Sequence, residues 1–251
     1  MKKVLLLSAA VVALASCSKT DKNPVFSKGT EVDAFEGKVW SSVQVTPKGQ
    51  PLEVSVFLSD DFLDSAPEGE GADPDHMHNA FVVPISQKGT EATPFQFIML
   101  NWNPVGHEPE DVYTLPHLDI HYYMTPMDQV MNYTDPVKLE NEPAADYIPA
   151  EHLAGPGVPT MGKHWLDTNS PEWHGATFDE TFIYGSYDGK VVFYEPMITK
   201  AFLQSTTGYE RSIPQPAKFQ KTGYYPTKMK IKKKNGATEV SLTDFIYRQA
   251  S

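Results

Sequence analysis

Residues 182–195 read FIYGSYDGKVVFYE, and this stretch decides the fold class. The Asp188-Gly189 pair supplies the positive φ angles that a two-residue turn needs. β-Branched and aromatic residues, which favour strands, flank this pair on both sides. We therefore predict a β-hairpin whose strands cover residues 182–187 and 191–195.

Similar patterns occur towards both ends of the chain. Residues 39–45 and 52–58 flank a Pro47-Lys48-Gly49-Gln50 turn, and residues 228–232 lead through Asn235-Gly236 into residues 238–242. Of the 251 residues, 12% are aromatic, and 21 prolines and 16 glycines rule out the composition of a helical bundle. The sequence predicts a mainly β fold, with a single β-rich domain over residues 30–251 that is sandwich-like or barrel-like.

The segments between the predicted strands indicate long loops and a few short helices. Residues 60–75 carry seven acids and no base, and we predict a solvated loop because their spacing does not match an EF-hand. The proline-rich residues 141–173 are also predicted to form a long loop. Short helices are expected within residues 126–133 and 198–204. The alternating lysines of residues 228–232 are typical of an exposed edge strand.

The N-terminus has the pattern of a bacterial export signal. Lys2 and Lys3 precede an apolar run, residues 4–15, that is shorter than the about 20 residues needed to span a bilayer. The run ends in Leu14-Ala15-Ser16-Cys17, which resembles a lipobox. We predict a lipoprotein signal peptide over residues 1–16, lipidation of Cys17 and a polar tether over residues 17–29. No aspartate directly follows Cys17, which favours the outer membrane of the cell envelope.

Charge and motifs exclude several classes of function. The net charge of −11 argues against nucleic acid as a partner, because phosphate binding needs a basic surface. A single cysteine allows no internal disulfide, and lipidation would leave no free thiol. The chain has neither a Gly-x-Gly-x-x-Gly loop for nucleotides nor a Gly-x-Ser-x-Gly nucleophile elbow. The sequence does not determine whether the protein forms a homo-oligomer.

Histidines concentrate where polar and apolar residues alternate. If residues 117–123 form a strand, His117, Asp119 and His121 point to one face and Leu118 and Ile120 to the other. Side chains at i and i+2 start roughly 6.6 Å apart along a strand, whereas i and i+4 are roughly 13 Å apart. Asp119 can therefore share a metal ion with either histidine, but the two histidines cannot share one.

Two further segments can bring ligands to this strand. His164 follows a glycine turn, and Glu195 ends the second strand of the hairpin. Histidine and carboxylate from separate segments are typical of zinc or iron sites on β scaffolds. A buried hydrogen-bond network without metal is the alternative. The predicted metal or ligand residues are Asp119, His121, His164 and Glu195, with His107, Glu108 and His117 in a second shell.

Several motifs in the same order resemble a bacterial family of unknown function that is named after a Thermus protein. They are residues 101–104, 106–109, 116–124, 161–165, 184–189 and 195–199, within a resemblance that covers roughly residues 30 to 248. The resemblance implies a secreted or lipid-anchored β-rich envelope protein without an assigned activity. Leu118 and Ile120 depart from the aromatic residues expected there, but this change lies on the apolar face of the strand.

The function predicted from the sequence is that of a lipid-anchored cell-envelope protein of unassigned activity. Its His/Asp/Glu centre is expected to bind a small ligand or a divalent metal such as zinc. The alternative is a metal-dependent hydrolase or lyase of the envelope, in which a carboxylate acts as general base. Glu108, Asp119 and Glu195 also supply the carboxylates of a glycosidase pair, whose separation the sequence does not determine. A purely structural component is a third possibility.

Overall fold

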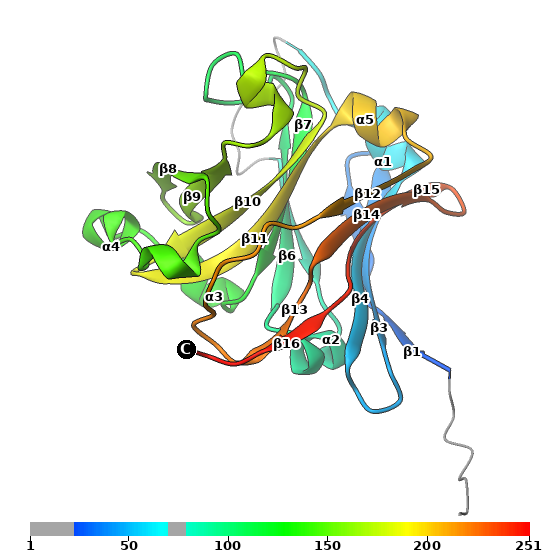
Figure 1. The fold of residues 1–251 in the computed structure, drawn as a ribbon. Helices are drawn as coiled ribbons and strands as arrows, with labels where there is room; N and C mark the ends of the chain where they lie inside the picture. Colours follow the sequence, from blue (N-terminus) through cyan, green and yellow to red (C-terminus); the bar gives the residue numbers. More distant parts are fainter. Residues whose placement is uncertain (1–22, 70–78) are drawn as a thin grey trace, which may run out of the picture.

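The computed structural model describes residues 23–69 and 79–251, which form a mainly β, sandwich-like fold (Figure 1). All strand pairs within the sheets are antiparallel, and these residues form no closed barrel. The predicted fold class is therefore confirmed, and the sandwich is the correct one of the two predicted forms. No helix in the described ranges has the length and apolar character needed to cross a bilayer.

Two seven-stranded sheets make up the sandwich. The first has the order β1 (Val25–Lys28), β3 (Gly37–Val45), β4 (Pro51–Ser59), β15 (Ala237–Thr243), β14 (Lys228–Lys233) and β12 (Gly208–Ser212), with β2 (Val32–Ala34) paired to β3. The second has the order β5 (Ala80–Pro84), β6 (Phe97–Asn103), β7 (His117–Tyr123), β11 (Lys190–Thr199), β10 (Glu180–Tyr187), β9 (Gly162–Asp167) and β8 (His152–Val158). A two-stranded ribbon of β13 (Gly223–Tyr225) and β16 (Ile246–Arg248) completes the β structure.

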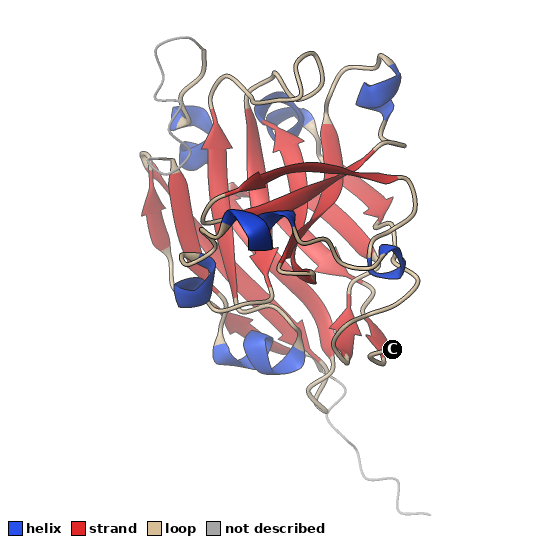
Figure 2. Ribbon diagram, turned by 90° about the vertical axis from the view of Figure 1, so that its left-hand side faces the viewer, coloured by secondary structure: helices blue, strands red, loops and turns tan. Residues whose placement is uncertain are grey.

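The helices are short and lie in the connections between strands (Figure 2). They are α1 (Asp60–Ser65), α2 (Gln87–Ala92), α3 (Met127–Val130), α4 (Pro136–Glu140) and α5 (Lys200–Ser205), with 3-10 turns η1 (Ala145–Tyr147) and η2 (Pro171–His174). The helices predicted within residues 126–133 and 198–204 correspond to α3 and α5. The second one starts later than predicted, because Ile198 and Thr199 continue strand β11.

The main core lies between the two sheets. Val54 and Val240 of the first sheet and Ile120 and Tyr194 of the second belong to one cluster of buried apolar side chains. Strand periodicity explains this, because alternate residues of each strand face the opposite sheet. The other face of the second sheet carries two smaller apolar clusters, which leaves room there for the polar residues of β7.

All three predicted hairpins are present, including the pair of β14 and β15 around Asn235-Gly236. Strand β10 pairs with β11 around the Asp188-Gly189 turn, and β3 pairs with β4. Two predictions about neighbouring segments were wrong. Residues 60–65 form α1 rather than a loop, because the Ser59 hydroxyl accepts a hydrogen bond from the Phe62 amide and caps the helix. Acids in the first turn of a helix interact favourably with its dipole, so the acidic composition does not oppose this helix.

The long loop predicted over residues 141–173 was also wrong, because it contains β8 and β9. Strand β8 includes Gly155, Pro156 and Gly157, which read as loop residues in the sequence. Its register with β9 shifts between Ala154 and Gly157, and β8 lies at the edge of its sheet. Proline is tolerated at edge strands and bulges, which explains how this segment joins the sheet.

Two boundaries of the first sheet differ from prediction. Val25–Lys28 pairs with β3 as strand β1, so the tether predicted over residues 17–29 ends earlier and the sheet begins before residue 30. The predicted edge strand β14 lies between β12 and β15. Its lysines have a different role, because Lys228 and Lys230 both pair with Glu210 on β12.

Candidate metal centre

Strand β7 carries the candidate residues on the face that points away from the main core. Leu118 and Ile120 belong to the core between the sheets, whereas His117, Asp119 and His121 occupy the alternate positions. The predicted alternation is therefore correct. All three polar residues are nonetheless buried, because the connections that cover this outer face bring further apolar side chains over them.

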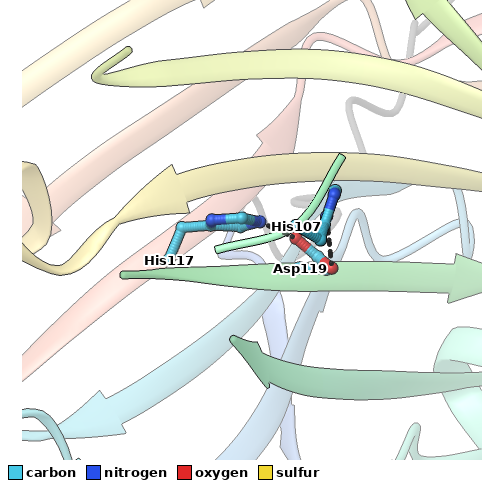
Figure 3. A group of neighbouring side chains, drawn as sticks. All are labelled: His107, His117 and Asp119. Atoms are coloured by element: carbon cyan, nitrogen blue, oxygen red, sulfur yellow. Dashed lines mark ion pairs between the residues drawn. The ribbon is translucent and has the colours of Figure 1, made fainter. Parts of the chain in front are cut away.

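His107, His117 and Asp119 form a group that we call the first triad (Figure 3). His117 and Asp119 stand on β7, and His107 comes from the connection that precedes this strand. The Nε2 atom of His117 lies 3.1 Å from Oδ1 of Asp119, and Nε2 of His107 lies 3.5 Å from Oδ2. One ligand atom from each of the three residues lies within 4.8 Å of the others.

Hydrogen bonds to the backbone set the orientation of both histidine rings. Nδ1 of His107 lies 2.6 Å from the Glu108 carbonyl oxygen, and Nδ1 of His117 lies 2.7 Å from the Leu115 carbonyl oxygen. A carbonyl oxygen only accepts, so each Nδ1 atom carries the hydrogen. In a neutral ring Nε2 is then the unprotonated nitrogen, and metal-binding histidines usually donate their other ring N–H to a carbonyl or carboxylate in this way.

Asp119 is held in the same way. The Asn103 side chain donates a 2.7 Å hydrogen bond to Oδ2 of Asp119, and Asn103 lies opposite His117 in the register of β6 and β7. Neither Oδ1 of Asp119 nor Nε2 of His117 has a hydrogen-bond partner among the described residues, although both atoms are buried. The two atoms lie close together, but their geometry is not that of a hydrogen bond.

Electrostatics favour the ionised form of Asp119. Burial tends to raise the pKa of this carboxyl, but His117 and His107 outweigh that effect and lower the pKa well below its usual range. Burial tends to lower the pKa of His107, but its hydrogen bond with Asp119 and the charge of that group raise it overall. The first triad therefore has a carboxylate that attracts a positive charge, either a proton or a metal ion.

His121, His164 and Glu195 form a second group, which we call the second triad. They come from β7, β9 and β11. Nε2 of His121 lies 3.3 Å from Oε1 of Glu195, and Nε2 of His164 lies 3.7 Å from Oε2. His121 and Glu195 are fully buried, whereas the His164 side chain keeps 13% of its accessible surface.

Aromatic rings hold the second triad in place. The Phe193 ring makes edge contacts with His121 and His164 at centroid distances of 4.9 and 5.3 Å, and Tyr123 stacks on His121 at 5.7 Å. Gly185 of β10 lies between His164 of β9 and Phe193 of β11 in the sheet register. A Cβ atom at this glycine would lie 1.9 Å from the Phe193 ring, so the ring needs a glycine there.

Without a cation, burial favours the uncharged forms of His121 and Glu195. It lowers the pKa of His121 to about 3, so that ring is neutral at physiological pH. Burial also raises the pKa of Glu195 well above its usual range, and the charge of Asp119 adds to this effect. The carboxyls of the two triads thus differ, because the surroundings lower the pKa of Asp119 and raise that of Glu195.

Both triads border one cavity of about 390 Å³. His107 and Asp119 line it from the first triad, and His164 and Glu195 from the second. The rest of its wall consists of Glu108 and mainly apolar side chains, which are Pro109, Pro156, Val158, Met161, Leu166, Ile183 and Met197. A small molecule in this cavity would contact both triads at once.

The structure changes the predicted grouping of the site residues. Asp119 was predicted to join His121, His164 and Glu195, but it lies in the first triad with the two histidines assigned to a second shell. The reason is that other segments supply the partners: Asp119 lies beside His117 and His107, whereas His121 lies beside Glu195 of β11. Glu108 lines the cavity outside both triads. His117 and His121 are in different triads, in agreement with their spacing.

Sequence reasoning missed the supporting residues, which are Asn103, Gly185 and Phe193. Asn103 and Gly185 had a weak signal, since each belongs to one of the motifs behind the family resemblance. Comparison of the chain with family models, curated proteins and solved structures gives no match. The resemblance to the family named after a Thermus protein therefore stays a prediction. Cys17 and part of the acidic segment over residues 60–75 lie outside the described residues.

Proposed function

We propose that this chain is a lipid-anchored cell-envelope protein that binds a divalent metal ion through the first triad. One observation carries the metal proposal: the Nε2 atoms of His107 and His117 and the Asp119 carboxylate converge on one point. Hydrogen bonds at Nδ1 fix the tautomers of both rings. Nε2 of His117 is buried but makes no hydrogen bond with a described residue. Zinc ligands lie about 2.0–2.1 Å from the ion, so two ligand atoms of a tetrahedral site are about 3.3–3.5 Å apart. The separations of 3.1 and 3.5 Å in the first triad fit this value.

Zinc is the first metal to test. Imidazole and carboxylate ligands suit zinc, and a set of two histidines and one carboxylate also suits non-haem iron(II). For a given nitrogen and oxygen site, zinc binds more tightly than iron(II). The resident metal therefore also depends on which ions the envelope supplies.

A metal-dependent hydrolase or lyase is the second candidate function. Structural zinc sites usually have four protein ligands, whereas catalytic sites have three and keep one position for water or substrate. The first triad has three ligands and borders the cavity. Bound zinc lowers the pKa of a coordinated water to about 7. Glu108 in the cavity wall supplies a carboxylate that can accept a proton during such a reaction.

The metal proposal predicts a difference between two histidine variants. The full-length chain is extracted from membranes in detergent, loaded with zinc, desalted and analysed for metal by mass spectrometry. We expect His107→Ala to bind about one ion fewer per chain than the wild type, because it removes a ligand of the first triad. His174→Ala is the matched control, since His174 is exposed and outside both triads. Equal metal content in all three proteins would contradict the proposal.

The envelope proposal depends on Cys17, because lipidation requires its thiol. We expect Cys17→Ser to abolish labelling with a fatty-acid probe and to move the protein from the membrane fraction to the soluble fraction. Ser16→Ala is the control, because it changes the adjacent residue and keeps the thiol. Membrane association that is unchanged in Cys17→Ser would show that the anchor lies elsewhere.

A further inference from the structure

We infer that the second triad binds a metal ion of its own, so that two separate ions border the cavity. The inference goes beyond the proposed function, which needs only the first triad. It concerns His121, His164 and Glu195, whose ligand atoms lie within 4.8 Å of one another. The class of ligand is a first-row divalent ion that accepts imidazole nitrogen and carboxylate oxygen.

The geometry of the second triad fits such an ion. The Nε2 atom of His121 is 3.3 Å from Oε1 of Glu195, and this is the separation expected between two ligands of a tetrahedral zinc ion. His164 approaches the other carboxylate oxygen at 3.7 Å. This separation is a few tenths of an ångström longer than the one expected between two ligands of a tetrahedral zinc ion.

Buried atoms without hydrogen bonds provide a second, independent observation. Nε2 of His121 and Oε2 of Glu195 make no hydrogen bond with any described residue, although both side chains are almost completely buried. A buried polar atom without a partner destabilises the fold, so such atoms need an explanation. An ion bound between them would satisfy both atoms and would also stabilise the ionised form of Glu195.

The site is also organised before any ion binds. Phe193 contacts both histidine rings, and Tyr123 stacks on one of them, so the rings lose little freedom when they bind metal. Gly185 leaves the space that the Phe193 ring occupies. These neighbours offer aromatic edges and faces to the triad rather than hydrogen-bond donors for Glu195.

The two ions would be separate because the triads share no residue. Paired metal ions that lie about 3.5–4 Å apart act together on one reacting group. Here the neighbouring residues Asp119 and His121 of β7 face different partners, since Oδ1 of Asp119 lies 3.1 Å from Nε2 of His117 and Nε2 of His121 lies 3.3 Å from Oε1 of Glu195. The charge of each ion is balanced in part by its own carboxylate, which limits the repulsion between the ions.

Metal stoichiometry tests this inference. Full-length protein in detergent is dialysed against buffered zinc, and bound zinc per chain is measured. We expect about two ions for the wild type and for His174→Ala, and about one each for His107→Ala, His164→Ala and Glu195→Gln. The double variant His107→Ala/His164→Ala should bind none. Near-ultraviolet circular dichroism shows that each variant is folded, and Glu195→Gln keeps the size of the side chain.

The outcomes separate this inference from the proposed function. One ion in the wild type that is retained in His164→Ala and Glu195→Gln would overturn the second site and leave the first in place. One ion that is lost in both His107→Ala and His164→Ala would show a single shared site, which also overturns the inference. Absence of zinc from the wild type would contradict both proposals.

Discussion

From the metal proposal we expect chelation to lower the unfolding temperature of the zinc-loaded wild type by about 5–10 °C at neutral pH. A ligand present at 100 times its dissociation constant stabilises the native state by about 2.7 kcal/mol, and each kcal/mol shifts the unfolding temperature of a domain of this size by about 2–4 °C. Asp119→Asn should reduce the part of this shift that arises from the first triad, because the neutral amide is a weaker metal ligand than the carboxylate. Thermal unfolding in buffered zinc and in excess chelator measures the difference.

The effect of chelation should shrink as the pH falls. Metal binding requires unprotonated histidines, and Asp119 raises the pKa of His107 above its ordinary value. Protons therefore compete with the ion already near neutral pH, and the shift should be small at pH 5. His174→Ala serves as the control and should behave like the wild type. A chelator effect that has the same size in Asp119→Asn would show that the first triad does not bind the stabilising ion.

Substitution of Gly185 should affect stability and the second triad together. In Gly185→Ala the new methyl group would lie 1.9 Å from the Phe193 ring, which is completely buried and must move. Overpacking of this kind costs about 1–3 kcal/mol, and sometimes more. Displacement of the ring also removes its contacts with His121 and His164. We expect a lower unfolding temperature and the loss of about one zinc ion per chain.

Gly208→Ala is the matched control, because Gly208 lies in a strand and a Cβ atom there meets nothing within 4 Å. A second substitution, Phe193→Leu, should recover part of the stability of Gly185→Ala, since the smaller side chain leaves room for the methyl group. If Gly185→Ala has the same unfolding temperature and metal content as Gly208→Ala, the close packing of Gly185 and Phe193 does not support the site.

The fold could be predicted where its signals are local. The Asp188-Gly189 turn joins two strands through adjacent residues, so the sequence alone is enough to predict that hairpin. Strand β8 was missed because its glycines and proline disfavour a strand, and only pairing with β9 places it in the sheet. The N-terminal boundary was misplaced for a similar reason, since β1 depends on pairing with residues that follow it in the chain.

The candidate site was predictable in composition but not in grouping. Every member of the two triads was named from the sequence. Alternation places His117, Asp119 and His121 on one face of β7, and the other members come from separate segments. Which residues meet depends on the order β7, β11, β10 and β9 in the sheet, and on the path of the connection that carries His107. Spacing along one strand contains neither piece of information, so the structure groups Asp119 with His107 and His117 rather than with the predicted partners.

The two triads also differ in how far apart their members lie along the chain. His107 and Asp119 are separated by 12 positions, whereas His121 and Glu195 are separated by 74. Closing a short segment costs less chain entropy than closing a long one, so the first triad can gather around an ion in the unfolded chain far more readily. Binding to the unfolded state reduces the stabilisation that an ion provides. An ion in the second triad would therefore bind only after the second sheet has folded. An ion in the first triad could bind before that sheet has assembled.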